Sequence, residues 1–299
     1  MLFAANINVM ADHKFKKIVN NAKIFEEDKI LNQQAIQINP YSQASFCVEV
    51  FFNEISLSTG TCFFIERNQK TFLVTNWHIV SGRNADTKEV LDIATGAIPN
   101  KLRVFVPHDN GDGTAQHSDD SYIDVPLYNE DGDPLWYEKC IDGRMIDVAL
   151  IPMQDINFCH LTIDEAEEPF NEGVCLEITS EIYIIGFPFA KKTGYIPIWK
   201  RGSVASEPLI DMEDMPFFYA DTATKSGMSG SPVVYYKDRP MIMVDESERK
   251  ISTHWTKFVG IYSGRIGADC DTRNDAQLGR IWKASVVDEI ISLYIPQNT

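Results

Sequence analysis

Long apolar runs are missing from this sequence. No segment approaches the roughly 20 consecutive apolar residues that a membrane-spanning helix needs. Residues 1–8 also lack the basic segment and apolar core of a secretory leader. We therefore expect a protein that is neither inserted in a membrane nor secreted, and that works in the cytoplasm.

Positive charge is also scarce. The 299 residues include 27 Lys and Arg against 43 Asp and Glu, which gives a formal net charge of −16. No basic cluster interrupts this acidic excess. Because nucleic acids and anionic lipids are bound chiefly through Lys and Arg, the composition argues against a nucleic-acid or membrane-surface partner.

Paired cysteines are absent as well. The spacing of the six cysteines fits neither a disulfide framework nor a zinc site. They are Cys47, Cys62, Cys140, Cys159, Cys175 and Cys270. We expect reduced thiols that pack as small apolar side chains, and we expect no metal and no cofactor.

Two acidic loops have the residue types of calcium-binding loops. Residues 109–113 read Asp-Asn-Gly-Asp-Gly, and residues 129–133 read Asn-Glu-Asp-Gly-Asp. Neither loop has the complete oxygen-ligand spacing of an EF-hand. Asn-Gly and Asp-Gly pairs are also what tight turns require, so we interpret both loops as turns and keep calcium as the weaker alternative.

A serine between two glycines is the most informative feature that the sequence does contain. Residues 227–232 read Gly-Met-Ser-Gly-Ser-Pro and lead into an apolar strand. Gly227 and Gly230 have no Cβ, so the backbone can adopt left-handed conformations there and a substrate can come close. In such a turn the N–H groups of Gly227 and Ser229 point at one spot, which suits a carbonyl oxygen that becomes negative during acyl transfer.

Two other segments carry the residues that activate a serine. His78 follows the strand-like run 70–77, and Asp147 opens an apolar run. The order His, Asp, Ser is that of the chymotrypsin arrangement, whereas subtilisins and α/β-hydrolases use other orders. We predict that His78, Asp147 and Ser229 form a catalytic triad.

With these segments the chain resembles the trypsin-like serine peptidases, and within them the bacterial HtrA/Deg-like branch. The resemblance covers roughly residues 43–295 and includes further glycine motifs at 186–188, 202–204 and 260–264. It implies an all-β fold with terminal helices. Two six-stranded β-barrel lobes of trypsin-like architecture would be followed by a C-terminal helix, with the active site between the lobes.

The chain then divides into four parts. Residues 1–42 are predicted as a helical extension, because apolar residues from Phe15 to Ala22 follow helical spacing. The predicted helix begins at about Asp12 and extends through residues 26–31. Residues 43–155 form the first lobe, 156–178 an acidic linker, and 179–299 the second lobe with its final helix. That helix is predicted to begin with a capping box at Ser285.

Short runs rich in Val, Ile, Phe and Thr predict the strands of the two lobes. They are 44–52, 60–66, 71–77, 102–106, 146–152, 176–187, 196–203, 217–221, 231–236, 258–263 and 278–282.

The resemblance implies peptide-bond hydrolysis in a protein or peptide substrate, through an acyl-enzyme. Ser229 is the nucleophile, His78 the general base and then acid, and Asp147 the residue that orients the imidazole. The N–H groups of Gly227 and Ser229 form the oxyanion hole.

Two alternatives to the predicted peptidase function remain. One is a catalytically silent barrel that acts as a protein-binding or scaffolding module, which the presence of all three triad residues disfavours. The other is an esterase, which Ser231 disfavours because it interrupts the Gly-x-Ser-x-Gly elbow.

The resemblance also places a specificity pocket for the residue before the scissile bond. Its residues are Ala223, Thr224, Tyr262, Ser263, Gly264 and Arg265, with Gly279 behind them. No aspartate lies at the floor, so a preference for Lys or Arg is not expected. We expect a small or medium apolar residue at that substrate position.

Two departures from secreted relatives concern disulfides and activation. Secreted relatives carry a cysteine directly after the catalytic His, where this chain has Ile79. The aspartate that pairs with a freed N-terminus in trypsin-type zymogens is replaced by Met228. We therefore expect gating rather than zymogen activation, by ordering of residues 209–217 or by an activating or tethering partner that binds residues 1–40.

Overall fold

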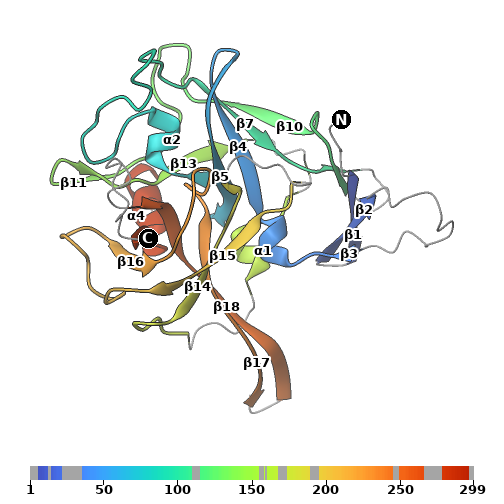
Figure 1. Cartoon of the computed structure of the whole chain (residues 1–299). Coiled ribbons are helices and arrows are strands. Elements are labelled where there is room, and N and C mark those ends of the chain that lie inside the picture. The colour runs from blue at the N-terminus through green and yellow to red at the C-terminus, as the bar shows by residue number, and fades with distance from the viewer. Residues whose placement is uncertain are drawn as a thin grey trace.

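Strands make up most of the described chain. The computed structural model describes residues 6–12, 15–21, 36–109, 115–154, 158, 160–167, 174–188, 195–244, 249–265 and 278–295 (Figure 1). The helices in these residues are short: α1 (Pro40–Gln43), α2 (Trp77–Ser81), α3 (Ile163–Ala166) and α4 (Ser285–Tyr294). None of the described helices has the length and apolar character needed to cross a membrane.

The second lobe is a closed antiparallel barrel. Around the ring the strands pair in the order β14-β15-β16-β19-β18-β17. They are β14 (Glu181–Gly186), β15 (Ile198–Val204), β16 (Phe217–Asp221), β17 (Pro232–Val244), β18 (Arg249–Arg265) and β19 (Leu278–Lys283). Side-chain alternation fills the lobe: Ile182 and Ile184 are fully buried, while Tyr183 between them is partly exposed.

The first lobe is a six-stranded antiparallel sheet in the order β10-β7-β4-β5-β6-β13. Its strands are β4 (Ser45–Phe52), β5 (Ile55–Arg67), β6 (Lys70–Thr75), β7 (Lys101–Phe105), β10 (Tyr122–Pro126) and β13 (Ala149–Met153). The segment after β10 forms two isolated bridges, one within itself between Tyr128 and Pro134 and one from Tyr137 to Leu150 of the edge strand β13. The predicted two-lobe, all-β architecture is confirmed, with a first lobe that is less regular than the second.

One apolar core joins the two lobes. The largest cluster of buried residues takes Phe63 and Leu150 from the first lobe, and Phe258 and Trp282 from the second. The rings of Phe63 and Phe258 meet edge to face, with centroids 5.3 Å apart. Helix α4 adds four buried residues to the same cluster: Val286, Val287, Ile290 and Ile291. Because this core is shared, packing fixes how the lobes sit on either side of the cleft between them.

The N-terminal segment is a hairpin, so the predicted helix from about Asp12 is wrong where the structure describes it. β1 (Asn6–Asp12) pairs with β2 (Phe15–Asn21). β1 also pairs with β9 (Ala115–His117), within a sheet that includes β3 (Ile36–Gln37) and β8 (His108–Asp109). Pairing with β9 satisfies backbone groups along β1, and the β-branched Ile18 and Val19 suit a strand. The remaining part of the predicted helix, residues 26–31, lies outside the described residues.

Helix α4 is where it was predicted, but it begins without the predicted capping box. Its N-cap is Ala284, and no side chain caps it. Ser285 already lies inside the helix, so its hydroxyl is one residue too late to cap. A capping box does occur at α3, where Thr162 and Glu165 each accept from the other's backbone N–H.

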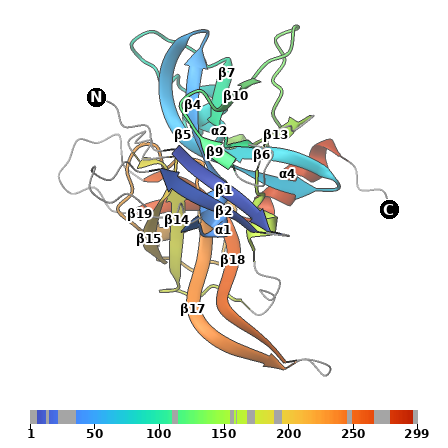
Figure 2. The same ribbon diagram turned by 90° about the vertical axis from the view of Figure 1, so that its right-hand side faces the viewer.

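A long ribbon projects from the second lobe. β17 and β18 pair as far as Val244 and Arg249, well beyond the predicted strands 231–236 and 258–263. Figures 1 and 2 both show this hairpin extending away from the barrel. A short hairpin of β11 (Cys140–Ile141) and β12 (Arg144–Met145) precedes Asp147.

Candidate active site

The turn that carries Ser229 connects β16 to β17. Hydrogen bonds from Met228 N to the Lys225 carbonyl (3.3 Å) and from Ser231 N to the Met228 carbonyl (3.1 Å) close it. Gly227 and Gly230 have φ values of 94° and 83°, which side chains rarely adopt. The Met228 side chain is buried in the core of the second lobe, and Ser229 is half-buried. The turn therefore anchors one side chain and leaves the serine next to it accessible.

Gly230 leaves no room for a larger residue. A Cβ at this position would lie 2.0 Å from the carbonyl oxygen of Thr61 and 2.5 Å from Thr75 Oγ1. The Gly230 N–H donates to the carbonyl of Tyr262 at 2.9 Å. The turn is therefore packed directly against β5 of the first lobe on one side and bonded to β18 on the other.

Thr61 braces the turn from the opposite lobe. Its N–H donates to the Ser229 carbonyl at 2.8 Å, and its Oγ1 donates to the Gly227 carbonyl at 2.9 Å. The same Oγ1 accepts from the Phe187 N–H at 3.1 Å. Thr61 was not singled out in the sequence. The structure shows that it is fully buried and that its N–H and hydroxyl are both hydrogen-bonded, as a buried threonine requires.

Asp147 holds His78 by two contacts. One carboxylate oxygen lies 2.7 Å from His78 Nδ1, and the other accepts the His78 backbone N–H at 2.8 Å. Asn76 supports the aspartate by donating to its carbonyl at 2.7 Å. Asp147 is only 4% exposed. An ionised carboxylate is acceptor-only, so Nδ1 carries the proton and Nε2 is left as the basic nitrogen of the neutral ring.

A second carboxylate fixes the helix that carries His78. Glu138 Oε2 accepts from the indole Nε1 of Trp77 at 2.6 Å and from that of Trp136 at 2.7 Å. Trp77 is the first residue of α2 and directly precedes His78. The position of the imidazole is thus set by neighbours on both sides of the chain.

The surroundings of His78 act on its pKa in opposite directions. Burial lowers the pKa of the imidazole, while the charge of Asp147 and the hydrogen bond to it raise the pKa. The net result is a pKa above the ordinary value. The neutral, basic form of His78 is therefore reached only at somewhat higher pH than for a free histidine.

His78 and Ser229 line the same cleft, which has a volume of about 360 Å³. Most of its other described lining residues come from the first lobe and were not predicted from the sequence. They include Leu57, Ser58, Thr59, Gly82, Leu91 and Pro99. Ser226 and Gly227 complete the side that belongs to the second lobe.

The predicted oxyanion donors differ from their neighbours in the turn. The N–H groups of Met228, Gly230 and Ser231 all donate to backbone carbonyls. Among the described residues, neither Gly227 N nor Ser229 N donates to another group. These two N–H groups therefore remain available to a substrate oxygen.

The predicted specificity residues lie apart from this cleft. None of the six is among the described residues that line it. Thr224 and Tyr262 are 2% and 1% exposed, and their hydroxyl groups are hydrogen-bonded to each other. Ala223, Ser263 and Gly264 are half-buried. The backbone of Arg265 pairs with Gly279, and its side chain lies outside the described structure.

The acidic loop 129–133 is a turn that bonds to itself. Asn129 Oδ1 accepts from the N–H groups of Asp131 (3.0 Å) and Asp133 (2.8 Å). No group of three or more potential metal ligands occurs in the part of the chain that the structure describes. Most of the other loop, residues 109–113, lies outside the described residues.

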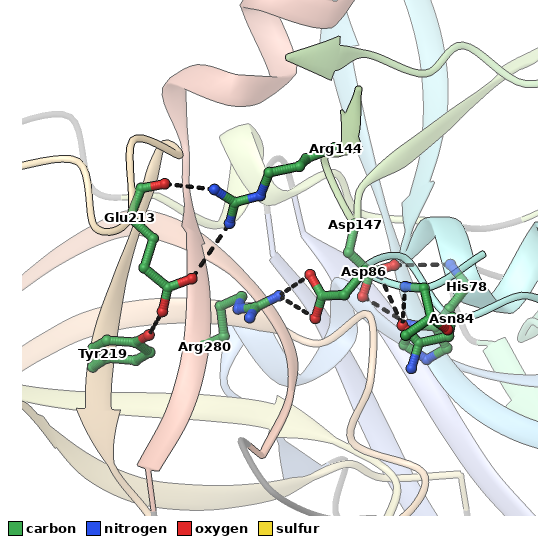
Figure 3. A network of polar contacts seen from close by, with 9 residues as sticks. His78, Asn84, Asp86, Arg144, Asp147, Glu213, Tyr219 and Arg280 are labelled. Atoms are coloured by element: carbon green, nitrogen blue, oxygen red, sulfur yellow. Dashed lines mark hydrogen bonds and ion pairs between the residues drawn. The ribbon is translucent and has the colours of Figure 1, made fainter. Parts of the chain in front are cut away.

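Two ion pairs cross between the lobes near the site, as Figure 3 shows. Arg280 of β19 bonds Asp86, which follows α2, at 3.2 Å. Arg144 of β12 donates to the Glu213 carbonyl at 2.6 Å and pairs with its carboxylate at 3.3 Å. Glu213 also accepts from the Tyr219 hydroxyl. The loop before β16 is thus tied to the strand that leads to Asp147.

Comparison with known proteins gives one family and several distant structures. The family model described as "Trypsin-like peptidase domain" matches residues 60–239. The inactive form of the Rv3671c protease from M. tuberculosis is 13% identical, with a TM-score of 0.44, over 85% of this chain and 92% of that one. A serine endoprotease from Yersinia pestis is 11% identical, with a TM-score of 0.46, over 88% and 69%. No curated protein sequence matches the chain.

A pair of glycines tests the packing of the turn that carries Ser229. Gly132 has nearly the same φ as Gly230, 85° against 83°, but a Cβ there would meet nothing within 4 Å. Gly132→Ala should therefore cost only the left-handed strain, about 1–2 kcal/mol. Gly230→Ala should cost clearly more, because the Thr61 carbonyl must move. Urea unfolding of both variants measures the difference, and equal midpoints would contradict the packing argument.

Proposed function

Because the chain belongs to the trypsin-like peptidase domain family, we propose that its serine protease activity is carried by a triad of Ser229, His78 and Asp147. The observation that carries the proposal is the double contact between Asp147 and His78, with His78 and Ser229 lining one cleft. Family membership implies a protein or peptide substrate. The bonds broken are internal peptide bonds, so the enzyme is an endopeptidase.

In the first half of the proposed reaction, Ser229 Oγ attacks the carbonyl carbon of the scissile bond while His78 Nε2 takes the hydroxyl proton. The carbonyl oxygen becomes negative and is held by the N–H groups of Gly227 and Ser229. The C–N bond then breaks, and His78 gives its proton to the leaving amine. In the second half, water attacks the acyl carbon while His78 takes its proton. The bond from that carbon to Ser229 Oγ then breaks, His78 returns the proton to Oγ, and the acid product leaves.

Asp147 acts through His78 in this scheme. Its carboxylate holds the Nδ1–H tautomer, so that the basic Nε2 is free for the serine proton. It also stabilises the imidazolium formed when that proton arrives, which agrees with the raised pKa of His78.

The cytoplasmic location is also a proposal, and the thiols support it. Cys47, Cys62, Cys140 and Cys175 are thiols and not disulfides in the structure. Burial, together with the neighbouring Cys47, raises the pKa of Cys62 well above its ordinary value. The thiol therefore stays protonated and unreactive, as expected of a packing residue. Mass spectrometry after alkylation under non-reducing conditions tests this, and a disulfide among these four would argue against a reducing compartment.

Gating is the final part of the proposal. Residues 209–217 were expected to control the site, and Glu213 in this segment bonds Arg144, three residues before Asp147. Buried Met215 anchors the segment, whereas Leu209 is 89% exposed and offers a contact for a partner. The hairpin β1–β2 is paired to β9, so a tethering role for residues 1–40 would act through a docked element.

A fluorophosphonate probe tests the nucleophile and the base. We expect wild type to be labelled, and Ser229→Ala and His78→Ala to lose labelling by at least about 100-fold. Ser231→Ala is the matched control, since its buried Oγ has no hydrogen-bond partner in the described structure. Folded wild type that is not labelled would instead favour a silent binding module.

The pH dependence of labelling tests the role of Asp147. In wild type, the rate should fall as the pH drops through a value above about 6.5, because His78 becomes protonated there. Asp147→Asn removes the charge that raises the pKa of His78, so the acid limb should move to lower pH and the rate should drop by up to about 10⁴-fold. Asp86→Asn, which alters the partner of Arg280, should leave the acid side of the pH profile unchanged. An unmoved limb in Asp147→Asn would contradict the assignment.

The Arg144–Glu213 contact tests the gating proposal. The two side chains are 40% and 51% exposed, so Arg144→Met should change stability by less than about 1 kcal/mol. If the segment controls the site, labelling should nevertheless slow several-fold. Arg201→Met, which breaks the exposed pair with Glu181 within the second lobe, is the control. Equal labelling rates for the two variants would place the control of activity elsewhere.

A further inference from the structure

Tyr262 is bonded at its backbone to the turn that carries Ser229. Its carbonyl accepts from Gly230 N at 2.9 Å, and its N–H donates to the Ser231 carbonyl at 3.0 Å. The ladder between β18 and β19 shifts register between Tyr262 and Gly264. These contacts leave Tyr262 little freedom to move away from the nucleophile.

The ring of Tyr262 occupies the space between β19 and the chain that leads to the nucleophile. A Cβ on Gly279 would lie 2.6 Å from its Cε2 atom, so glycine at 279 is what admits the ring. At its far end the hydroxyl is bonded to Thr224 Oγ1, five residues before Ser229. The ring thus lies against two of the segments expected to form the specificity pocket, those of Gly279 and Thr224.

Hydrogen bonding and burial leave the ring no solvent-facing surface. Tyr262 is 1% exposed and Thr224 is 2% exposed. The two hydroxyl groups are bonded to each other, so neither needs a substrate group as partner. Tyr262 also belongs to the buried cluster of the second lobe, together with Met228 and Ile281. Moving the ring out would open a cavity in that core.

We infer that Tyr262 fills the specificity pocket and limits the residue before the scissile bond to Gly, Ala or Ser. This inference rests on the proposed function, because it concerns the same site. The space that a large apolar side chain would take is occupied by the chain's own tyrosine. A substrate residue with an acidic or amide group would have to break the bond between Tyr262 and Thr224, which the burial of both groups opposes.

Inactivation by peptidyl phosphonates measures this preference directly. The probes share one peptide and differ only at the position next to phosphorus, which carries the side chain of Ala, Leu, Phe or Glu. One extra methylene in a closed pocket changes selectivity by roughly 10- to 200-fold. We therefore expect wild type to react at least about tenfold faster with the Ala probe than with any of the others.

Two variants assign the preference to the ring. Tyr262→Ala removes it, so the ratio of Ala to Phe or Leu reactivity should fall at least about tenfold. Tyr262→Phe is the matched control: it keeps the ring and loses only the hydroxyl, so the preference for Ala should remain. Circular dichroism and thermal unfolding establish that each variant is folded. If Tyr262→Ala does not fold, Tyr262→Val takes its place. The order of the wild-type reaction rates with the four probes still tests whether the pocket is filled.

The outcomes separate this inference from the proposed function. Faster reaction of wild type with the Phe, Leu or Glu probe would overturn the filled pocket while leaving the serine protease in place. A small-residue preference that persists in folded Tyr262→Ala would overturn the role of Tyr262. A simple alkyl fluorophosphonate carries no such side chain and reports on Ser229 alone. If it too fails to label wild type, the proposed function fails and this inference with it.

Discussion

The hydrogen bonds of Thr61 are the interaction on which the site depends most. This one residue of the first lobe holds two carbonyl groups of the turn that carries Ser229 in the second. Those bonds fix the Gly227–Met228 and Ser229–Gly230 peptide planes, and so restrict the peptide between them, which carries the Ser229 N–H. The close approach that they require is possible only because residue 230 has no side chain. The core shared by both lobes keeps β5 at that distance, so packing far from the cleft sets the geometry of a few backbone groups within it.

Close packing against a glycine also holds the chain beside His78, where no disulfide is present. Ile79 occupies the position at which secreted relatives carry a cysteine, and its Cδ1 lies 2.5 Å from where a Cβ on Gly60 would be. An isoleucine that is 4% exposed is therefore packed over a glycine of β5. Apolar burial can replace a covalent link here because both residues lie in an existing core, where each buried methyl or methylene group stabilises the fold by about 0.8 kcal/mol.

The parts of the fold and site that could be predicted from the sequence are those with a local signal. Strand alternation located both lobes, and the glycines around Ser229 marked a turn that only left-handed backbone can form. The pairing of His78 with Asp147 followed from their order along the chain. Thr61 could not be found in this way, since its importance lies in contacts with residues more than 100 positions away. The hairpin β1–β2 was not predicted, because the apolar residues of this segment have helical spacing. Its structure is set instead by pairing with β9, which the spacing does not reveal. Tyr262 was expected to line the specificity pocket, but the packing of its ring against Gly279 and its bond to Thr224 became visible only in the structure.

The ribbon of β17 and β18 has strand edges that no other described strand covers. β17 pairs with β14 only as far as Tyr235, and β18 pairs with β19 only from Gly260 onward. Between those points and the tip, each strand has the other as its one partner among the described strands. The outer edges therefore present rows of amide and carbonyl groups that either water or an added strand must satisfy. An extended polypeptide that pairs with this edge would be bound through its backbone, largely independently of its sequence.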